Sequence, residues 1–151
     1  MRAAGRGTRC AAEFAARSVT FECAGVRLAG LGIALATSDS KRRMKAVIDL
    51  LELGQWLDVA VCREDTPREK PAPDLFLAAA SALGVEAGAC LVIEDSSRGI
   101  AAARAAGMTV IGFMAYCGPT SLRVGADAYL ATFKAVDLAQ LRALWHGCAK
   151  L

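Results

Sequence analysis

The sequence predicts an α/β fold in which a mostly parallel sheet is covered by helices on both faces, a three-layer arrangement. From Gly32 onward, short apolar runs alternate with amphipathic segments of helical spacing. This order is typical of a parallel sheet with crossover helices. The apolar runs are also continuous rather than interrupted by polar residues, as expected for strands that are buried on both faces.

Each expected strand is a short apolar run that ends at polar or turn-forming residues. The first, "GIALATS", ends in hydroxyl side chains, and the third, "ACLVIED", ends in two acids. The run "DAYLA" is long enough only for a short strand. The expected strands cover residues 32–38, 57–62, 89–95, 108–113 and 127–131.

The segments between the strands carry helix signals. Met44, Val47, Ile48 and Leu51 recur at helical spacing, and Gly54 ends that segment. A serine precedes the helix after the third strand and is a favoured N-cap. The expected helices cover residues 40–54, 72–84, 96–107 and 135–145.

Composition excludes several classes of protein. With 151 residues the chain should form one domain with a core, and a dispersed net charge of +3 does not indicate a nucleic-acid binder. No apolar stretch reaches the ~18 residues of a membrane span. The six cysteines form no C-x-x-C pair and His146 is the only histidine, which argues against zinc and a disulfide framework. We expect a cytoplasmic protein, although the Arg- and Ala-rich start would also suit a transit peptide.

Polar residues collect where the expected strands end. In an open parallel sheet ligands bind at the carboxyl ends of the strands, so residues far apart in sequence can share one crevice. A hydroxyl group and the first N–H groups of a following helix can hold an anion such as phosphate. A lysine ammonium ~4 Å from a phosphate oxygen would attract that anion by on the order of 4 kcal/mol at an effective dielectric constant of ~20. The candidates for this anion site are Thr37, Ser38, Asp39 and Lys70.

Two acids follow the third expected strand. Glu94 and Asp95 cannot easily lie side by side near a buried strand end without a compensating charge, and the hard cation Mg²⁺ takes oxygen ligands. The pair therefore predicts a Mg²⁺ site. Simpler interpretations stay open, because Asp95 with the serines after it is also an ordinary helix N-terminus. Thr37 could be a turn residue, and Lys70 a surface lysine.

Three stretches in this order resemble motifs of the haloacid dehalogenase (HAD) superfamily, in its branch of β-phosphoglucomutase-like enzymes and small sugar-phosphate phosphatases. "IALATSDS" is similar to the second motif and "EKPAPDLFLAAASALGV" to the lysine-bearing third motif. "CLVIEDSSRGIAAARAAGMTVIGF" is similar to the fourth motif and the strand after it. The resemblance covers roughly residues 26 to 145 and implies a Rossmann-like, HAD-type fold.

The resemblance also implies roles for single residues. Thr37 would bind the transferring phosphate, and Lys70 would balance charge between that phosphate and the nucleophile. Asp95, assisted by Glu94, would hold Mg²⁺, and Ser96 would support the metal site. The implied activity is Mg²⁺-dependent hydrolysis, or mutase transfer, of the phosphoric monoester of a small phosphorylated metabolite.

Two parts of the family pattern are missing. The family's nucleophile and acid–base group are the aspartates of a D-x-D-G motif, and the sequence contains no D-x-D. The nearest candidate, "VTFECAGV", has Glu22 at the nucleophile position, as a weak surrogate, and Ala24 at the acid–base position. The stretch "AGVR" can equally be the segment just upstream of the second motif. The helical cap domain that follows this motif in the family is absent too, because Val26 and Thr37 are too close in sequence to hold it.

We therefore divide the chain into an atypical N-terminal segment, residues 1–25, which could include a degenerate first strand, and a HAD-like core, residues 26–151. By resemblance the core is a Mg²⁺-dependent phosphatase of small phosphorylated metabolites, with weak or no turnover by this truncated chain alone. Its partners should include neither nucleic acid nor membrane, and no oligomeric state follows from the sequence. The alternative is a degenerate, non-catalytic module that binds phosphate, Mg²⁺ or another protein.

Overall fold

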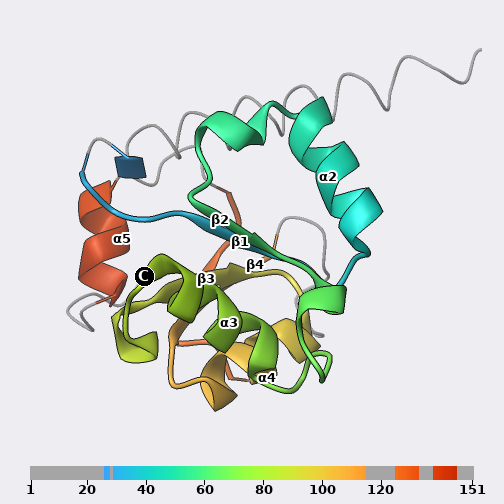
Figure 1. The fold of residues 1–151 in the computed structure, drawn as a ribbon. Helices are drawn as coiled ribbons and strands as arrows, with labels where there is room; N and C mark the ends of the chain where they lie inside the picture. The colour runs from blue at the N-terminus through green and yellow to red at the C-terminus, as the bar shows by residue number, and fades with distance from the viewer. Residues whose placement is uncertain (1–25, 28, 115–124, 133–137, 146–151) are drawn as a thin grey trace, which may run out of the picture.

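The computed structural model describes residues 26–27, 29–114, 125–132 and 138–145. Strands and helices alternate along this part of the chain (Figure 1). The strands are β1 (Ala34–Ala36), β2 (Val59–Val61), β3 (Leu91–Glu94), β4 (Thr109–Phe113) and β5 (Ala128–Leu130). The helices are α2 (Lys41–Leu50), α3 (Asp74–Leu83), α4 (Ser97–Ala105) and α5 (Leu138–Trp145), with short 3₁₀ helices η1 (Leu53–Gln55), η2 (Arg63–Asp65) and η3 (Ala87–Ala89) between them.

The strand pairing confirms the predicted α/β fold with a parallel sheet. β1 pairs with β2, β3 with β4, and β4 with β5, all in the parallel sense. Within the described residues β1 and β3 do not pair with each other, so the strands form two parts, β1–β2 and β3–β4–β5. We call the interval between these two strands the β1–β3 break.

Helices cover opposite faces of β4. Val110 and Ile111 are neighbours on this strand, so their side chains point to opposite faces. Val110 is buried in a cluster with Ile100 and Ala103 of α4, whereas Ile111 packs with Leu141 of α5. The strands here therefore form the middle of three layers, as the sequence predicts.

Helix α3 covers β1 and β2. Leu75 and Ala79 of α3 pack with Val61, Ala34 and Ala36 of the two strands. Figure 1 shows α3 and α4 next to each other on one side of the strands and α2 on the other. The two parts of the sheet therefore share one helical layer.

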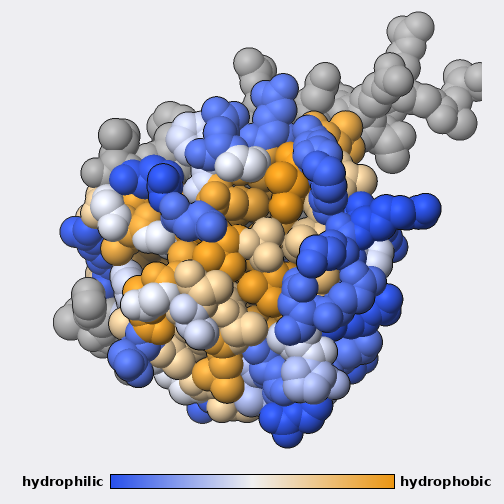
Figure 2. All heavy atoms as spheres, in the orientation of Figure 1, coloured by the Kyte–Doolittle hydropathy of each residue, from blue (hydrophilic) through white to orange (hydrophobic). Residues whose placement is uncertain are grey.

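The side chains near the β1–β3 break are less completely covered. Ile93 follows the buried Val92 on β3 and is 41% exposed. Figure 2 shows apolar side chains on the viewed face over β1, β2 and α3, next to a hydrophilic surface over α2 and η2. No helix in the described part of the chain is long and apolar enough to span a bilayer.

The local sequence explains where the helices begin and end. The hydroxyl of Ser40 accepts a hydrogen bond from the backbone N–H of Arg43 and caps α2. Gly84 adopts φ 71°, a left-handed conformation that favours glycine, and ends α3. The helix expected over residues 40–54 is α2 followed by η1, because the chain leaves the α conformation after Leu50.

Candidate functional site

One cavity lies where β1 and β3 end. It has a volume of about 410 Å³ and is bordered by both parts of the sheet. The residues that line it are Leu35, Ala36, Thr37, Ser38, Lys70, Ile93, Glu94, Asp95, Ser96 and Phe113. The structure therefore brings together the three polar segments that the sequence analysis selected.

Lys70 is the buried cation of this cavity. Its Nζ lies 2.7 Å from Oε2 of Glu94 and 3.4 Å from the backbone oxygen of Ala36. It also lies 4.6 Å from the centre of the Phe76 ring, within the range of a cation–π contact. The side chains of Lys70 and Glu94 are each only 10% exposed. This ion pair thus connects the carboxyl end of β1 with that of β3.

The backbone of Lys70 is held from α4. The guanidinium of Arg98 donates a hydrogen bond to the carbonyl oxygen of Lys70. The sequence analysis missed this contact, because Arg98 occupies an exposed helical position where arginine is common. We infer that Arg98 orients the loop that carries Lys70.

The carboxylate of Glu94 uses both of its oxygens. Oε2 accepts from Lys70, and Oε1 accepts from the Ser96 hydroxyl at 2.8 Å and from the N–H groups of Asp95 and Ser96 at 3.2 and 3.1 Å. Burial raises the pKa of Glu94, but the hydrogen bond and charge of Lys70 and the hydrogen bonds of Ser96 outweigh it and lower that pKa. Glu94 is therefore ionised and faces inward, toward Lys70.

Gly99 makes room for this carboxylate. A Cβ atom at position 99 would collide with the side chain of Glu94. The N–H of Gly99 also donates to the Ser96 hydroxyl at 3.0 Å, which caps α4. The sequence analysis missed this role, although a glycine in the first turn of a helix was a possible signal, because glycine lowers helix stability.

Asp95 is the second acid that lines the cavity. Burial and the negative charge of Glu94 raise the pKa of Asp95, so a cation beside it would be favourable. Within the described residues no group of three or more His, Cys, Asp or Glu side chains could hold a metal ion. Mg²⁺ does not require such a cage, because one or two carboxylates with phosphate oxygens and water commonly hold it. The oxygen donors here fit Mg²⁺ in that manner.

The segment after β1 contributes Thr37 and Ser38 to the cavity but not Asp39. The N–H of Thr37 donates to the carbonyl of Val61 at 3.0 Å, and the Thr37 hydroxyl accepts from the N–H of Asp39 at 3.1 Å. Asp39 is not among the lining residues, and its carboxylate lies 3.4 Å from Arg43 of α2. Two hydroxyl-bearing residues of this segment therefore line the cavity.

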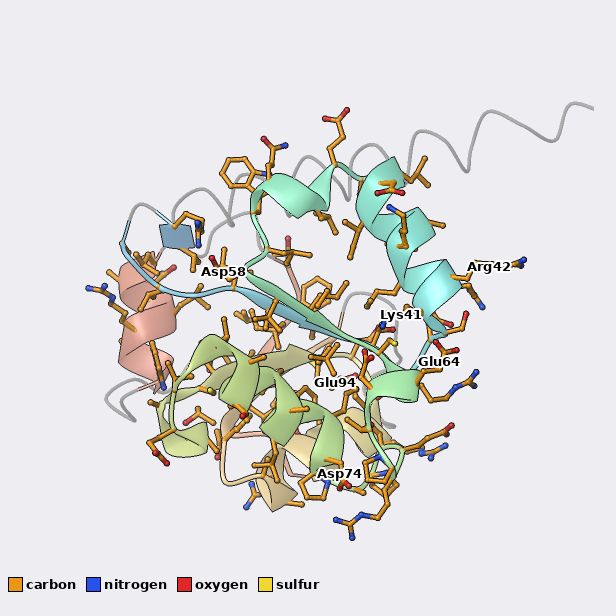
Figure 3. All side chains as sticks on the ribbon, in the orientation of Figure 1. Lys41, Arg42, Asp58, Glu64, Asp74 and Glu94 are labelled. Carbon is orange, nitrogen blue, oxygen red and sulfur yellow. The ribbon has the colours of Figure 1, made fainter. Side chains whose placement is uncertain are left out.

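Protein groups already occupy part of the N-terminus of α2. A carboxylate oxygen of Glu64 accepts from the N–H of Lys41 at 2.8 Å, and the Ser40 hydroxyl accepts from the N–H of Arg43 at 3.3 Å. Figure 3 shows Lys41 and Glu64 close together at the end of the strands where Glu94 lies. An anion in the cavity would therefore rely on Thr37 and Lys70 more than on this helix.

The proposed surrogate nucleophile lies outside the described residues. This applies to Glu22 and to the whole N-terminal segment 1–25. Of the residues that the sequence analysis selected, the cavity is therefore lined by Thr37, Ser38, Lys70, Glu94, Asp95 and Ser96, and not by Asp39.

Comparison with known families identifies the chain's relatives. Residues 23–107 match the family of haloacid dehalogenase-like hydrolases. The chain belongs to this family. Its matches to CbbY proteins and β-phosphoglucomutases confirm the predicted phosphoglucomutase-like branch of the HAD superfamily.

Individual relatives cover most of this chain but only part of their own length. The chain is 33% identical over 115 residues to protein CbbY of Rhodobacter capsulatus, which covers 74% of this chain and 48% of the relative. It is 38% identical over 79 residues to the fructose-1-phosphate phosphatase YqaB of Escherichia coli, covering 52% and 42%. The chain therefore spans less than half the length of these curated relatives.

A solved structure gives a similar result for the fold. CbbY from Rhodobacter sphaeroides in complex with phosphate matches with a TM-score of 0.74 and 26% sequence identity. The match covers 83% of this chain and 57% of that structure's chain. The HAD-type, Rossmann-like architecture predicted from the sequence is thereby confirmed.

Proposed function

We propose that the cavity binds the phosphoryl group of a small phosphorylated metabolite beside Mg²⁺, as part of a phosphoric monoester hydrolase or phosphomutase site. The observation that carries this proposal is the position of the buried Lys70 ammonium, in one cavity with Thr37, Ser38 and Asp95. A positive group and two hydroxyls suit phosphate oxygens. The phosphatase and the phosphate complex among the relatives support the same class of ligand.

Lys70 would be the main anion-binding group. A lysine ammonium has three N–H groups. Glu94 and the carbonyl of Ala36 account for two of them. The third remains for a phosphate oxygen, and Glu94 fixes the ammonium so that little side-chain freedom is lost on binding. Thr37 and Ser38 would add hydroxyl donors from the β1 side.

Asp95 would hold Mg²⁺ on the β3 side. When bound, Mg²⁺ would neutralise charge on the phosphoryl oxygens during transfer. Glu94 would act by positioning Lys70, since both of its oxygens are already engaged. Ser96 would support this arrangement through its hydrogen bond to Glu94 rather than by touching the phosphate.

Turnover needs a nucleophile and an acid–base group in addition. A carboxylate nucleophile divides phosphoryl transfer into two easier steps, and a positioned acid–base group contributes roughly 100- to 10,000-fold. The sequence contains no D-x-D motif. We therefore expect this chain alone to bind phosphate with Mg²⁺ and to hydrolyse phosphate esters weakly or not at all.

The missing motif also favours a second function, a module that binds phosphate or Mg²⁺ without catalysis. Two measurements on the purified full chain separate the functions. One is binding of inorganic phosphate by calorimetry with and without Mg²⁺, and the other is hydrolysis of an aryl phosphate under the same conditions. Mg²⁺-dependent hydrolysis would support an enzyme, whereas binding without hydrolysis would support the module.

Variants connect either result to the cavity. We expect Asp95→Asn to remove the dependence of phosphate binding on Mg²⁺. Lys70→Met should weaken phosphate binding ~10- to 100-fold, since a hydrogen bond to a charged group is worth about 1.5–3 kcal/mol. Asp39→Asn is the matched control, because Asp39 does not line the cavity and should leave binding unchanged. If folded wild-type protein binds no phosphate, or if Asp39→Asn has the largest effect, the proposed site is wrong.

A further inference from the structure

Strand β2 has a free edge in the described part of the chain, because it pairs with β1 alone. The N–H of Val59 donates to the carbonyl of Ile33 on the β1 side. The carbonyl of Val61 accepts from the N–H of Thr37, which follows β1. Successive residues of a strand direct their backbone groups to opposite edges, so the N–H and C=O of Ala60 point to the free edge. Ala60 is also exposed.

This free edge offers an outside strand only one residue with both backbone groups available. After β2 the N–H of Cys62 donates to the carboxylate of Asp65 at 2.9 Å. Before β2 the N–H of Asp58 donates to the carbonyl of Ile33 at 2.9 Å. In an antiparallel pair, two residues directly opposite each other can exchange both of their N–H···O bonds. A second copy of the chain meets this requirement when a two-fold axis places Ala60 opposite its own equivalent.

The same two-fold axis would bring the α3 helices of the two copies together. Helix α3 packs on both β1 and β2, so its axis lies above the interval between these two strands. Neighbouring strands lie about 4.8 Å apart, so two such helices on a sheet continued through β2 lie roughly 10 Å apart. Packed helices have axes about 8–10 Å apart. The strand pairing therefore places the two α3 helices, which run antiparallel, at a distance suited to direct packing.

The side of α3 that would meet its equivalent carries small, uncharged side chains. Phe76 and Ala80 of α3 belong to the core cluster that includes residues of α4. By helical periodicity Ala78 and Ala82 lie on the side of α3 that faces away from α4, toward the free edge of β2. Ala82 is exposed and Ala78 is half-buried, and Figure 2 shows apolar side chains on the face over β1, β2 and α3. Two copies can therefore approach along this side without burying a charge.

The charges at the two ends of β2 are complementary in this arrangement. Asp58 precedes β2 and Arg63 follows it, and both side chains stay partly exposed in the ion pairs that they form within the chain. In an antiparallel register centred on Ala60, Asp58 of one copy lies opposite Cys62 of the other, next to Arg63. An acid therefore meets a base at each end of the contact, and two like charges do not meet.

We infer that the free edge of β2 and the adjoining side of α3 form a homodimer interface with Ala60 at its two-fold axis. A contact of this isologous kind closes on itself, so the assembly ends at two chains. The inference does not depend on phosphate binding, because neither Ala60 nor the α3 residues of this interface line the cavity at the ends of β1 and β3.

Sedimentation velocity of the purified full chain over a range of concentrations tests the oligomeric state. We expect a reversible equilibrium between monomer and dimer. Ala60→Pro should raise the dissociation constant at least tenfold, because proline removes the outward N–H while the bonds to β1 come from Val59 and Val61. Ala82→Glu should do the same, because it brings two carboxylates into the helix contact. Ala101→Glu, at an exposed position of α4, is the matched control and should leave the constant unchanged, and circular dichroism confirms folding.

Disulfide formation between two copies locates the contact. In Ala60→Cys the two thiols face each other across the axis, because directly opposite residues have Cα atoms about 5.5 Å apart, a distance that a disulfide spans. The fully buried Cys62 is kept. The other native cysteines are replaced by serine, namely Cys10, Cys23, Cys90, Cys117 and Cys148.

The linked dimer should form at least ten times faster from Ala60→Cys than from Ala101→Cys in the same background. Equal rates for these two proteins would place the contact on another face and overturn the inference. A chain that stays monomeric at every concentration would overturn it as well. So would assemblies larger than a dimer, or a dimer that neither Ala60→Pro nor Ala82→Glu weakens.

Discussion

The two ends of the sheet are each held by an ion pair, and the pairs differ mainly in burial. At the amino end, Arg27 and Asp58 have side chains that are 43% and 33% exposed. At the carboxyl end, Lys70 and Glu94 are each 10% exposed. Exposed pairs contribute little to stability, whereas removing one partner of a buried pair leaves a buried charge without its counter-charge. Similar ionic chemistry therefore forms an ordinary surface contact at one end and part of the wall of the cavity at the other.

The largest effect is expected for Glu94→Gln. This change leaves the Lys70 ammonium buried without its counter-charge, which should destabilise the folded protein by about 3–5 kcal/mol. Urea unfolding followed by circular dichroism measures the loss. The double variant Glu94→Gln with Lys70→Met should recover part of it, because no unpaired buried charge remains.

The amino-end pair supplies the control for that measurement. Arg27→Gln should shift the urea midpoint far less than Glu94→Gln, and the small shift should shrink further in high salt, which screens exposed charges. Equal shifts for the two variants would show that burial does not distinguish the pairs. The two ion pairs would then contribute equally to stability.

Gly99→Ala should have the next largest effect. The added methyl group collides with the Glu94 side chain, so either the carboxylate or α4 must move. Overpacking of this kind costs typically ~1–3 kcal/mol. Gly88→Ala is the matched control, because its added Cβ meets no atom within 4 Å. The urea midpoints of the two variants are compared with that of the wild type. Equal midpoints for Gly99→Ala and Gly88→Ala would contradict the role given to Gly99.

The smallest effect on stability is expected for a change at Asp65. This acid is exposed, and its pKa is shifted by hydrogen bonds rather than by burial. Hydrogen bonds from the thiol and N–H of Cys62, together with Lys41, lower the pKa of Asp65 from 3.8 to about 2. A lowered folded-state pKa gives stability that is present above the unfolded value and is lost as the pH falls through about 2.

Asp65→Asn should therefore remove one contribution to acid sensitivity. The difference in urea midpoint between wild type and Asp65→Asn is expected to be larger at pH 5 than near pH 2. Wild type and variant are compared at each pH, so that the titration of other carboxylates cancels. A difference that stays constant over this pH range would argue against the lowered pKa.

The sequence predicted the order of strands and helices, because periodicity and capping residues act locally. It also predicted that Thr37, Lys70 and Asp95 would meet, since the carboxyl ends of parallel strands share one edge. Their roles toward phosphate and Mg²⁺ stay predictions. The exact helix ends were less predictable, as the expected helix over 40–54 shows by dividing into α2 and η1.

The contacts that organise the site could not be predicted from local patterns. Gly99 leaves room for the Glu94 side chain at the start of α4, and this contact depends on the rotamer and packing of Glu94. Arg98 matters because the loop with Lys70 passes beside α4. Asp39 follows two cavity residues in sequence, yet its carboxylate lies beside Arg43, a cation in the first turn of the helix that follows it. Such contacts depend on three-dimensional neighbours that sequence spacing does not give.

Helix α4 buries Ile100, at 1% exposed, together with the completely inaccessible Ala102 and Ala103. Alanine has no side-chain rotamers, so at Ala102 and Ala103 the contact cannot absorb a displacement by a change of rotamer. The N-terminal turn of α4, with Ser96 beside Glu94, is therefore located by the back of the helix rather than by the site itself. A larger side chain at Ala102 or Ala103 would therefore displace α4 as a whole, and the displacement would reach Lys70 through Arg98 and Glu94.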